Sequence, residues 1–261
     1  MISRSQTKGL PQQIAATDVI DWFATDTGAS VLAEERTAFG RLADQLFGFQ
    51  LLQLGLLESE KPMLVDTGIK NQTLVGNFHS SSWKNYLVAE HDSLPVLTDS
   101  IDAVLLPHTL DFCLDPQKVL LEAERVLIPE GRLIISGFNP FSLWGIVKTI
   151  KGKSSAVPMN AHFVSYTRLH DWLSLLGFDV EKTEVLMFRP PLESTGLMHK
   201  LEFMEKLGSR IWPRFGGVYL IRAVKRVSTL TPVVPLWKRR PRLLSQVVEP
   251  STRGVNRGKT G

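Results

Sequence analysis

The residues of this sequence that could do chemistry follow short apolar runs. His108 comes directly after one such run, and Glu90, His91 and Asp92 come directly after another. A histidine can orient a polar ligand or take a proton near neutral pH, and a carboxylate can accept a hydrogen bond from an amino group. The structural alternatives stay open, since His108 could be a hydrogen-bonded core residue and the two acids could be solvated turn residues.

A third group of candidate residues lies after the apolar run from 132 to 136. Asn139, Phe141 and Trp144 occupy the segment that follows it. The two aromatic side chains would suit an aromatic or lipid-like ligand. Aromatic residues at this spacing are equally typical of a protein core, so a role in ligand binding and a role in the core both stay open.

The sequence lacks the motifs of several other kinds of functional site. Lys151-Gly152-Lys153-Ser154 resembles the end of a phosphate-binding loop, but the glycine needed five positions before Gly152 is Val147. The six histidines show no HExxH spacing, and Cys113 is the single cysteine, so we expect neither a metal site nor a disulfide framework.

Strands and helices alternate through the middle of the chain, which indicates βαβ units and a parallel sheet covered on both faces. We predict strands over 49–55, 74–78, 86–89, 101–106, 132–136, 179–188 and 217–227, with the last two as a plausible hairpin. We predict helices over 31–47, 116–127, 166–176 and 197–208, a short helix capped by Thr17-Asp18, a cap at Asp115 and a turn at 129–131. Ligands of such sheets bind beyond the carboxyl ends of the strands, where the strand order reverses. Residues that directly follow a strand are therefore the candidates for ligand contact.

Charge divides the chain into a body and a tail. The net charge of the 261 residues is +4, but nine basic residues and one acid lie from Lys225 onward, which leaves −4 on residues 1–224. Four prolines in the tail disfavour helix and central strand. We therefore expect an N-terminal segment over 1–30, a folded domain over 31–228 and a basic, disordered tail over 229–261.

No apolar stretch is long enough to span a bilayer, and the N-terminus lacks the apolar core of a secretory signal. A cytoplasmic location is therefore the expectation. The oligomeric state stays open.

Residues 86–140 resemble the class I S-adenosylmethionine-dependent methyltransferases of the small-molecule type (methyltransferase type 11 group). The resemblance rests on Leu94-Pro95-Val96, Ile101-Asp102-Ala103-Val104, Asp115-Pro116 and the run from Glu124 to Gly131. It implies an α/β fold with a doubly wound, mostly parallel, Rossmann-like sheet of seven strands and an antiparallel C-terminal strand. It also implies S-adenosylmethionine as the cofactor.

The same resemblance places the site residues. The implied cofactor contacts are Leu54, Gly55, Asn77, Glu90, His91, Asp92, Pro107 and His108. The implied acceptor contacts are Asn139, Phe141 and Trp144, and His108 is a candidate for the otherwise unassigned catalytic residue. The sequence departs from the family where Gly55 is the single glycine of its loop and Phe78 replaces the ribose-binding carboxylate, which leaves Asn77 or His79 as neutral substitutes.

Three functions follow from these observations. The first is a methyltransferase acting on an unidentified, small-molecule acceptor. The second is a relative of that fold which has lost catalysis and serves as a binding or regulatory module, as the departures from the cofactor motifs suggest. The third is an RNA methyltransferase, in which the basic tail alone would contact nucleic acid.

Overall fold

The computed structural model describes residues 16–44, 46–55, 63–64, 67–76, 83–151, 157–191, 208, 210, 212 and 214–226. By its contacts the chain divides into residues 1–227 and 228–261. The second unit lies outside the described residues, as does nearly all of the helix predicted over 197–208. The domain boundaries drawn from the sequence therefore stay predictions.

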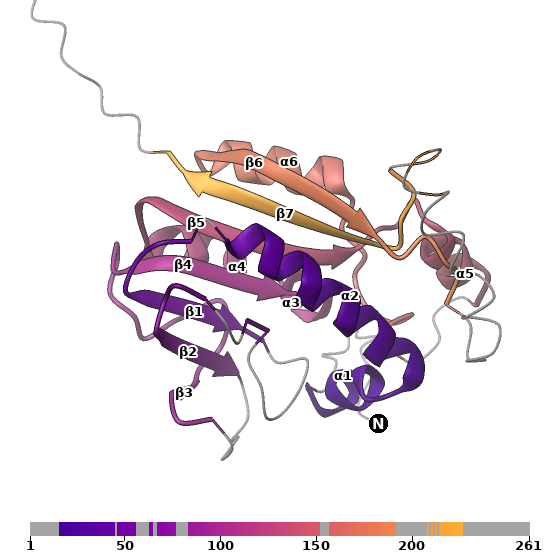
Figure 1. The fold of residues 1–261 in the computed structure, drawn as a ribbon, viewed down its shortest axis with the longest axis horizontal. Coiled ribbons are helices and arrows are strands. Elements are labelled where there is room, and N and C mark those ends of the chain that lie inside the picture. The colour runs from indigo at the N-terminus through magenta and orange to yellow at the C-terminus, as the bar shows by residue number, and fades with distance from the viewer. Residues whose placement is uncertain are drawn as a thin grey trace, which may run out of the picture. The chain divides into compact units, whose positions relative to one another are not determined.

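The core of the fold is a seven-stranded sheet in the order β3-β2-β1-β4-β5-β7-β6 (Figure 1). Its strands are β1 (Gln50–Leu54), β2 (Asn71–Gly76), β3 (Tyr86–Val88), β4 (Ile101–Pro107), β5 (Leu127–Phe138), β6 (Phe178–Leu186) and β7 (Val218–Lys225). The pairs among β1 to β5 are parallel, and β7 pairs antiparallel with both β5 and β6. The predicted fold class and the predicted hairpin are confirmed.

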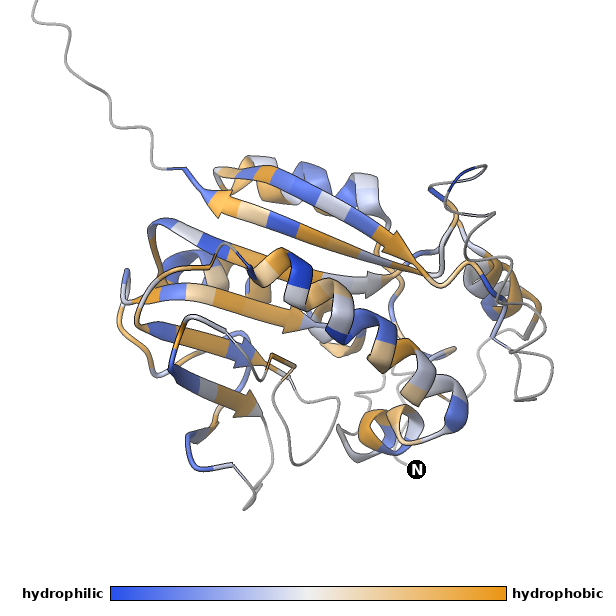
Figure 2. Cartoon of the chain, in the orientation of Figure 1, coloured by the Kyte–Doolittle hydropathy of each residue, from blue (hydrophilic) through white to orange (hydrophobic). Residues whose placement is uncertain are grey.

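Helices cover both faces of this sheet. The described helices are α1 (Ala16–Phe23), α2 (Asp26–Ala43), α3 (Thr109–Phe112), α4 (Pro116–Val126), α5 (Leu143–Lys151) and α6 (Tyr166–Leu175). On one face, Phe39 and Leu42 of α2 pack over Leu51 of β1, and Figure 1 shows α2 crossing in front of the sheet. On the other face, Leu120 of α4 and Leu169 of α6 complete a second apolar cluster. Figure 2 shows the strands β4 and β7 as mostly hydrophobic, as burial on both sides requires.

Local signals explain most of the boundaries. The side chain of Asp115 accepts a hydrogen bond from the Lys118 amide and caps α4, as predicted, and Pro116 fills the first helical turn. The short N-terminal helix exists, but Thr17 and Asp18 lie within α1 rather than at its cap.

The turn predicted at 129–131 is absorbed into β5. Leu127 pairs with Ile101 and Arg132 pairs with Ala103, so the intervening residues bulge out of the register. Glu130, at φ 63°, supplies the left-handed residue that such a bulge needs. The strand therefore continues past the bulge and stays parallel to β4.

Candidate functional site

Beyond the carboxyl end of β1 the chain turns sharply at Gly55. Its φ of +83° lies in the left-handed region that favours glycine, and its amide donates to the carbonyl of Val75 on β2 at 2.9 Å. A Cβ on Gly55 would lie 3.2 Å from Oγ1 of Thr109, which itself donates to the carbonyl of Leu54 at 2.6 Å. The ends of β1, β2 and β4 are thus tied together at the point where the strand order reverses.

Gln53 fixes the loop that follows β1, a role that the sequence did not reveal. Its buried side chain accepts a hydrogen bond from the Met63 amide at 2.8 Å and donates to the carbonyl of Gly55 at 3.1 Å. One amide therefore binds the residue that opens the loop and a residue after it. The signal available in the sequence is a polar residue inside an otherwise apolar strand, which has to find partners when buried.

Three predicted residues follow β3. Glu90 and Asp92 are exposed, and Glu90 forms an isolated bridge with Ser93. His91 is half-buried, and its Nε2 is inaccessible to solvent without a hydrogen-bond partner. Burial lowers the pKa of His91 below 6.5 against the opposing effects of the Glu90 carboxylate and a hydrogen bond to the Val75 backbone, so the ring is neutral at pH 7.

Part of the predicted cofactor set falls outside the described residues. The predicted contact concerned is Asn77, and its alternative His79 and the substituted Phe78 lie outside as well. Their contribution to the site stays a prediction.

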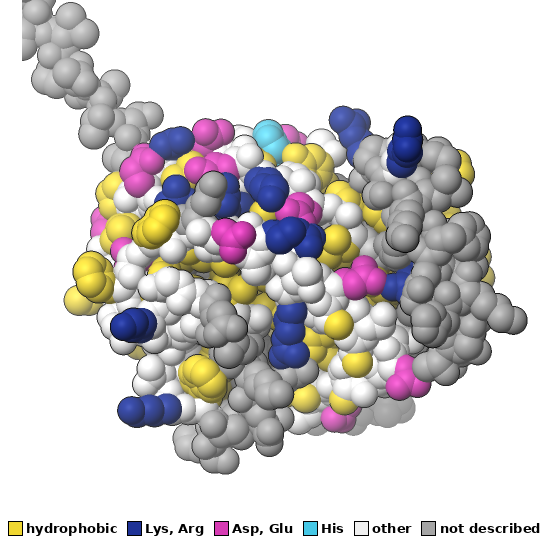
Figure 3. Space-filling view, in the orientation of Figure 1, with side chains coloured by type: hydrophobic (Ala, Val, Ile, Leu, Met, Phe, Trp, Pro, Cys, Tyr) yellow, Lys and Arg dark blue, Asp and Glu magenta, His cyan; other side chains and the backbone are white. Residues whose placement is uncertain are grey.

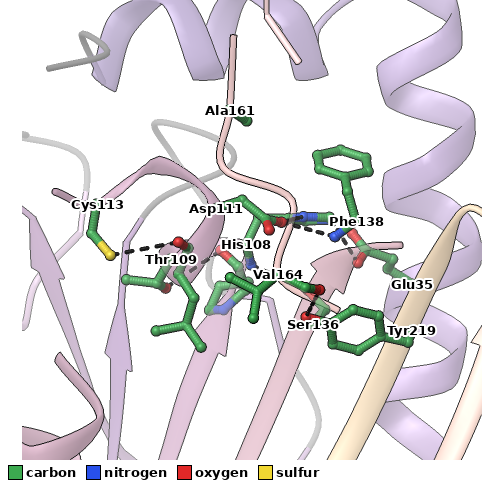
Figure 4. Close-up of polar contacts among 12 residues, drawn as sticks. Glu35, His108, Thr109, Asp111, Cys113, Ser136, Phe138, Ala161, Val164 and Tyr219 are labelled. Atoms are coloured by element: carbon green, nitrogen blue, oxygen red, sulfur yellow. Dashed lines mark hydrogen bonds and ion pairs between the residues drawn. The ribbon is translucent and has the colours of Figure 1, made fainter. Parts of the chain in front are cut away.

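At the end of β4, His108 lies at the centre of a buried charged cluster, which we call the charge cluster and which consists of Glu35, His108 and Asp111 (Figure 4). Nδ1 of His108 lies 2.7 Å from Oδ2 of Asp111, and Nε2 lies 2.9 Å from Oε1 of Glu35 on α2. Oδ2 of Asp111 also accepts a hydrogen bond from the Phe138 amide at 2.9 Å. The cluster therefore joins α2, β4 and the end of β5.

Electrostatics make His108 a cation. Burial alone would lower its pKa, but the carboxylates of Glu35 and Asp111 outweigh burial and raise it to about 9. Burial raises the pKa of Asp111, although His108 and the Phe138 amide oppose that shift. A fully buried, protonated ring with both nitrogens paired suits a structural link better than a base.

The three predicted acceptor residues have different surroundings. The amide of Asn139 donates to the carbonyls of Arg214 and Gly216, and its Oδ1 accepts from the Phe141 amide, so its side chain is occupied. Trp144 is fully buried, and its Nε1 donates to the Arg189 carbonyl at 2.8 Å. Phe141 alone of the three is exposed. The contacts of these three residues with an acceptor stay predictions.

A half-buried aromatic cluster adjoins the charge cluster, and it was not predicted. We call it the aromatic cluster; it consists of Trp22, Phe112 and Phe163, which pack around Phe138 with ring centroids 5.1 to 6.4 Å from it. Lys148 of α5 lies 4.1 Å above the centre of the Phe163 ring, and its ammonium donates to the Ala161 carbonyl. Burial lowers the pKa of Lys148, with Asp111 opposing the shift.

The sequence offered little signal for this cluster. Trp22, Phe112 and Phe163 come from α1, α3 and the segment before α6, so no single periodic pattern contains them. A residue far away in the sequence holds the segment of Phe163, since the His162 amide donates to the Asp111 carbonyl at 2.7 Å. The carboxyl edge of the sheet thus presents polar groups at β1 to β3, including the exposed acids Glu90 and Asp92, and aromatic rings with a lysine at β4 and β5.

The sequence matches one protein family and is similar to known proteins. The family model described as "Methyltransferase domain" matches residues 63–135, which begins after the Gly55 loop. The uncharacterized protein YafS of Escherichia coli (strain K12) is 34% identical over 187 residues, which is 72% of each chain.

Solved structures show the same fold. An S-adenosylmethionine-dependent methyltransferase from Thermotoga maritima matches with a TM-score of 0.54 at 20% identity, over 80% of this chain and 95% of that one. Another, from Archaeoglobus fulgidus, matches with a TM-score of 0.52 at 19% identity, over 76% and 94%. The strand order with an antiparallel β7 is typical of these proteins. The resemblance drawn from the sequence is confirmed, and the chain belongs to the class I S-adenosylmethionine-dependent methyltransferases, in the methyltransferase type 11 group.

Proposed function

We propose that this protein catalyses methyl transfer from S-adenosylmethionine to a small-molecule acceptor. Family membership and fold supply the reaction class. The cofactor would supply a methyl group already activated by its sulfonium, so the protein's task is to bind the two reactants and orient them.

The observation that carries the proposal is the set of unused polar groups beyond β3, on the β1 side of the sheet's carboxyl edge. His91 has a buried ring nitrogen without a partner, and Glu90 has an exposed carboxylate two residues beyond β3. Gly55 places a residue without a side chain at the same edge of the sheet. A hydroxyl-rich and amino-bearing group such as adenosine fits these groups, because it offers donors to Glu90 and a partner to His91.

On the other side of the switch, the aromatic cluster supports a planar or apolar acceptor. Trp22, Phe112 and Phe163 each keep part of their surface accessible. Lys148 adds a cation at the same place. The role of His108 in this proposal is to hold α2, β4 and β5 in position as a paired cation, and an acceptor that is already nucleophilic needs no base from it.

The test is calorimetry of the full-length chain with S-adenosylhomocysteine. We expect saturable binding, and we expect His91→Ala to weaken it by up to about tenfold, the value of one hydrogen bond. His170→Ala, which truncates an exposed histidine on α6, is the matched control and should leave the affinity unchanged. Absence of binding at millimolar ligand would overturn the proposal in favour of a fold relative without catalysis.

A further inference from the structure

Helix α5 exposes an apolar stripe. Leu143, Ile146 and Ile150 share one side of the helix at i, i+3 and i+7, and the exposed fractions of the two isoleucines are 55% and 79%. The other side of α5 is buried through Trp144 and Gly145. A surface helix normally turns polar residues to solvent, so an apolar side left exposed marks an interaction site.

The stripe continues onto a second segment of the chain. The side-chain amide of Asn139 donates to the carbonyls of Arg214 and Gly216, which holds the segment of Phe141 beside the segment of Phe215. Phe141, Phe215 and nearby Trp212 are all more than half exposed. Two chain segments therefore contribute apolar side chains to one region, which we call the α5 surface.

Exposed arginines lie in the segment that contributes Trp212 and Phe215 to the α5 surface. Residues 131–170 and 206–226 include eleven basic residues and no acidic one, but Arg132, Arg222, Lys225 and Arg226 pair with acids of other segments at the far end of β5 and β7 and do not belong to this surface. Arg210 and Arg214 are exposed. Figure 3 shows a different composition over α2 and β6, where acidic and basic side chains are mixed and Arg41 pairs with Glu184. The α5 surface therefore combines exposed apolar groups with the exposed cations of Arg210 and Arg214.

We propose that the α5 surface docks on an anionic lipid bilayer, with α5 lying in the interface. Apolar side chains gain by leaving water for the acyl boundary, and cations beside them are attracted to anionic headgroups. A second copy of the chain would bring two positive surfaces together, which disfavours self-association through this face. No described helix is long and apolar enough to cross a membrane, so the attachment is peripheral. The basic tail would supply a second attraction to the anionic bilayer.

Co-sedimentation of the full chain with vesicles tests this proposal. We expect binding to phosphatidylcholine vesicles that contain phosphatidylglycerol, weakened by salt, and little binding to pure phosphatidylcholine. Ile146→Glu combined with Ile150→Glu should reduce the bound fraction at least tenfold. Leu175→Glu is the matched control, because Leu175 is 85% exposed on α6, and it should bind as the unaltered protein does.

Three outcomes would overturn the proposal. The double variant could bind as strongly as the unaltered protein, which would assign binding to the tail. Vesicle binding could be absent altogether. The unaltered protein could instead be a dimer that the double variant dissociates, which would assign the surface to a second copy.

A measurement on the unaltered side chains guards against misfolding of the double variant. Brominated lipid should quench tryptophan fluorescence of the bound protein, and Trp212→Phe should remove most of that quenching. Unchanged quenching in that variant would contradict docking through this surface. None of these assays contains S-adenosylmethionine, so their results are independent of the proposed catalysis.

Discussion

Different kinds of interaction stabilise the two halves of the sheet's carboxyl edge. At the ends of β1 and β2, neutral hydrogen bonds from Gly55, Gln53 and Thr109 fix the backbone. At the ends of β4 and β5, the charge cluster of Glu35, His108 and Asp111 fixes it from inside the core. The first half keeps polar groups available to a ligand, whereas the second consumes its polar groups internally.

This difference indicates a division of labour. Buried charges are costly unless each keeps its partner, so the charge cluster specifies one arrangement of α2, β4 and β5. Neutral hydrogen bonds cost less to rearrange, so the β1 side can adjust to a ligand. We therefore expect substitutions in the charge cluster to change mainly stability, by a large amount, and substitutions around Gly55 to change stability less and ligand binding as well.

The largest expected effect is that of His108→Ala. This change leaves the carboxylates of Glu35 and Asp111 buried without their cation, which should lower the free energy of unfolding by about 3–5 kcal/mol. Urea denaturation measures it. His170→Ala removes an exposed imidazole and should cost less than about 0.5 kcal/mol. Equal losses in the two variants would show that the cluster contributes no stability.

The second prediction concerns pH. The folded-state pKa of His108, about 9, exceeds the ordinary value of 6.5, because Glu35 and Asp111 outweigh its burial. The stabilisation is therefore complete below about pH 6.5 and is lost as pH rises through 9, amounting to about 3 kcal/mol. The free energy of unfolding should decline between pH 7 and 9.5.

Glu35→Gln sharpens this test. It removes the carboxylate that raises the pKa of His108 most, so the decline above pH 7 should become shallower. Asp111 and the nearby Lys148 remain in both proteins and serve as the common background. Parallel declines in the two proteins would assign the pH dependence to other groups.

The same division explains what could be predicted from the sequence. Strands such as β4 and the cap at Asp115 follow from residues adjacent in the chain, and Gly55 follows from a strand that ends in glycine. His108 could be placed beyond β4 by the same reasoning. Its partner Glu35 could not, because Glu35 lies on α2 and faces the core from what reads as the polar side of that helix. The pairing depends on tertiary packing that no local pattern encodes.

The aromatic cluster shows a second limit. Its rings come from three separate segments, and Lys148 lies on α5, a helix that is absent from the helices predicted from the sequence. The Gly55 turn, by contrast, needs one residue type at one position. Sequence reasoning therefore reached the β1 side of the site more completely than the β4 and β5 side.

The third prediction tests the backbone on the β1 side. Gly55→Ala places a Cβ in the left-handed region and 3.2 Å from Oγ1 of Thr109, so we expect a loss of about 1–2 kcal/mol in the free energy of unfolding and weaker binding of S-adenosylhomocysteine. Gly40→Ala is the matched control, since a Cβ there meets nothing within 4 Å in α2, and it should gain about 0.5–1 kcal/mol. Losses of the same size at both positions would remove the special role of the Gly55 turn.

The smallest expected effect lies where the two halves meet. Thr109, at the start of α3, donates to the Leu54 carbonyl at the end of β1, so it links the β4 side to the β1 side. Thr109→Val keeps the shape and removes that donor, which should cost about 1 kcal/mol. Amide hydrogen exchange locates the effect. Exchange should accelerate at Gly55 and stay unchanged at the Phe138 amide, which Asp111 binds, because loss of this link loosens the β1 turn without touching the charge cluster. Equal acceleration at both amides would mean that the two halves of the edge open as one unit.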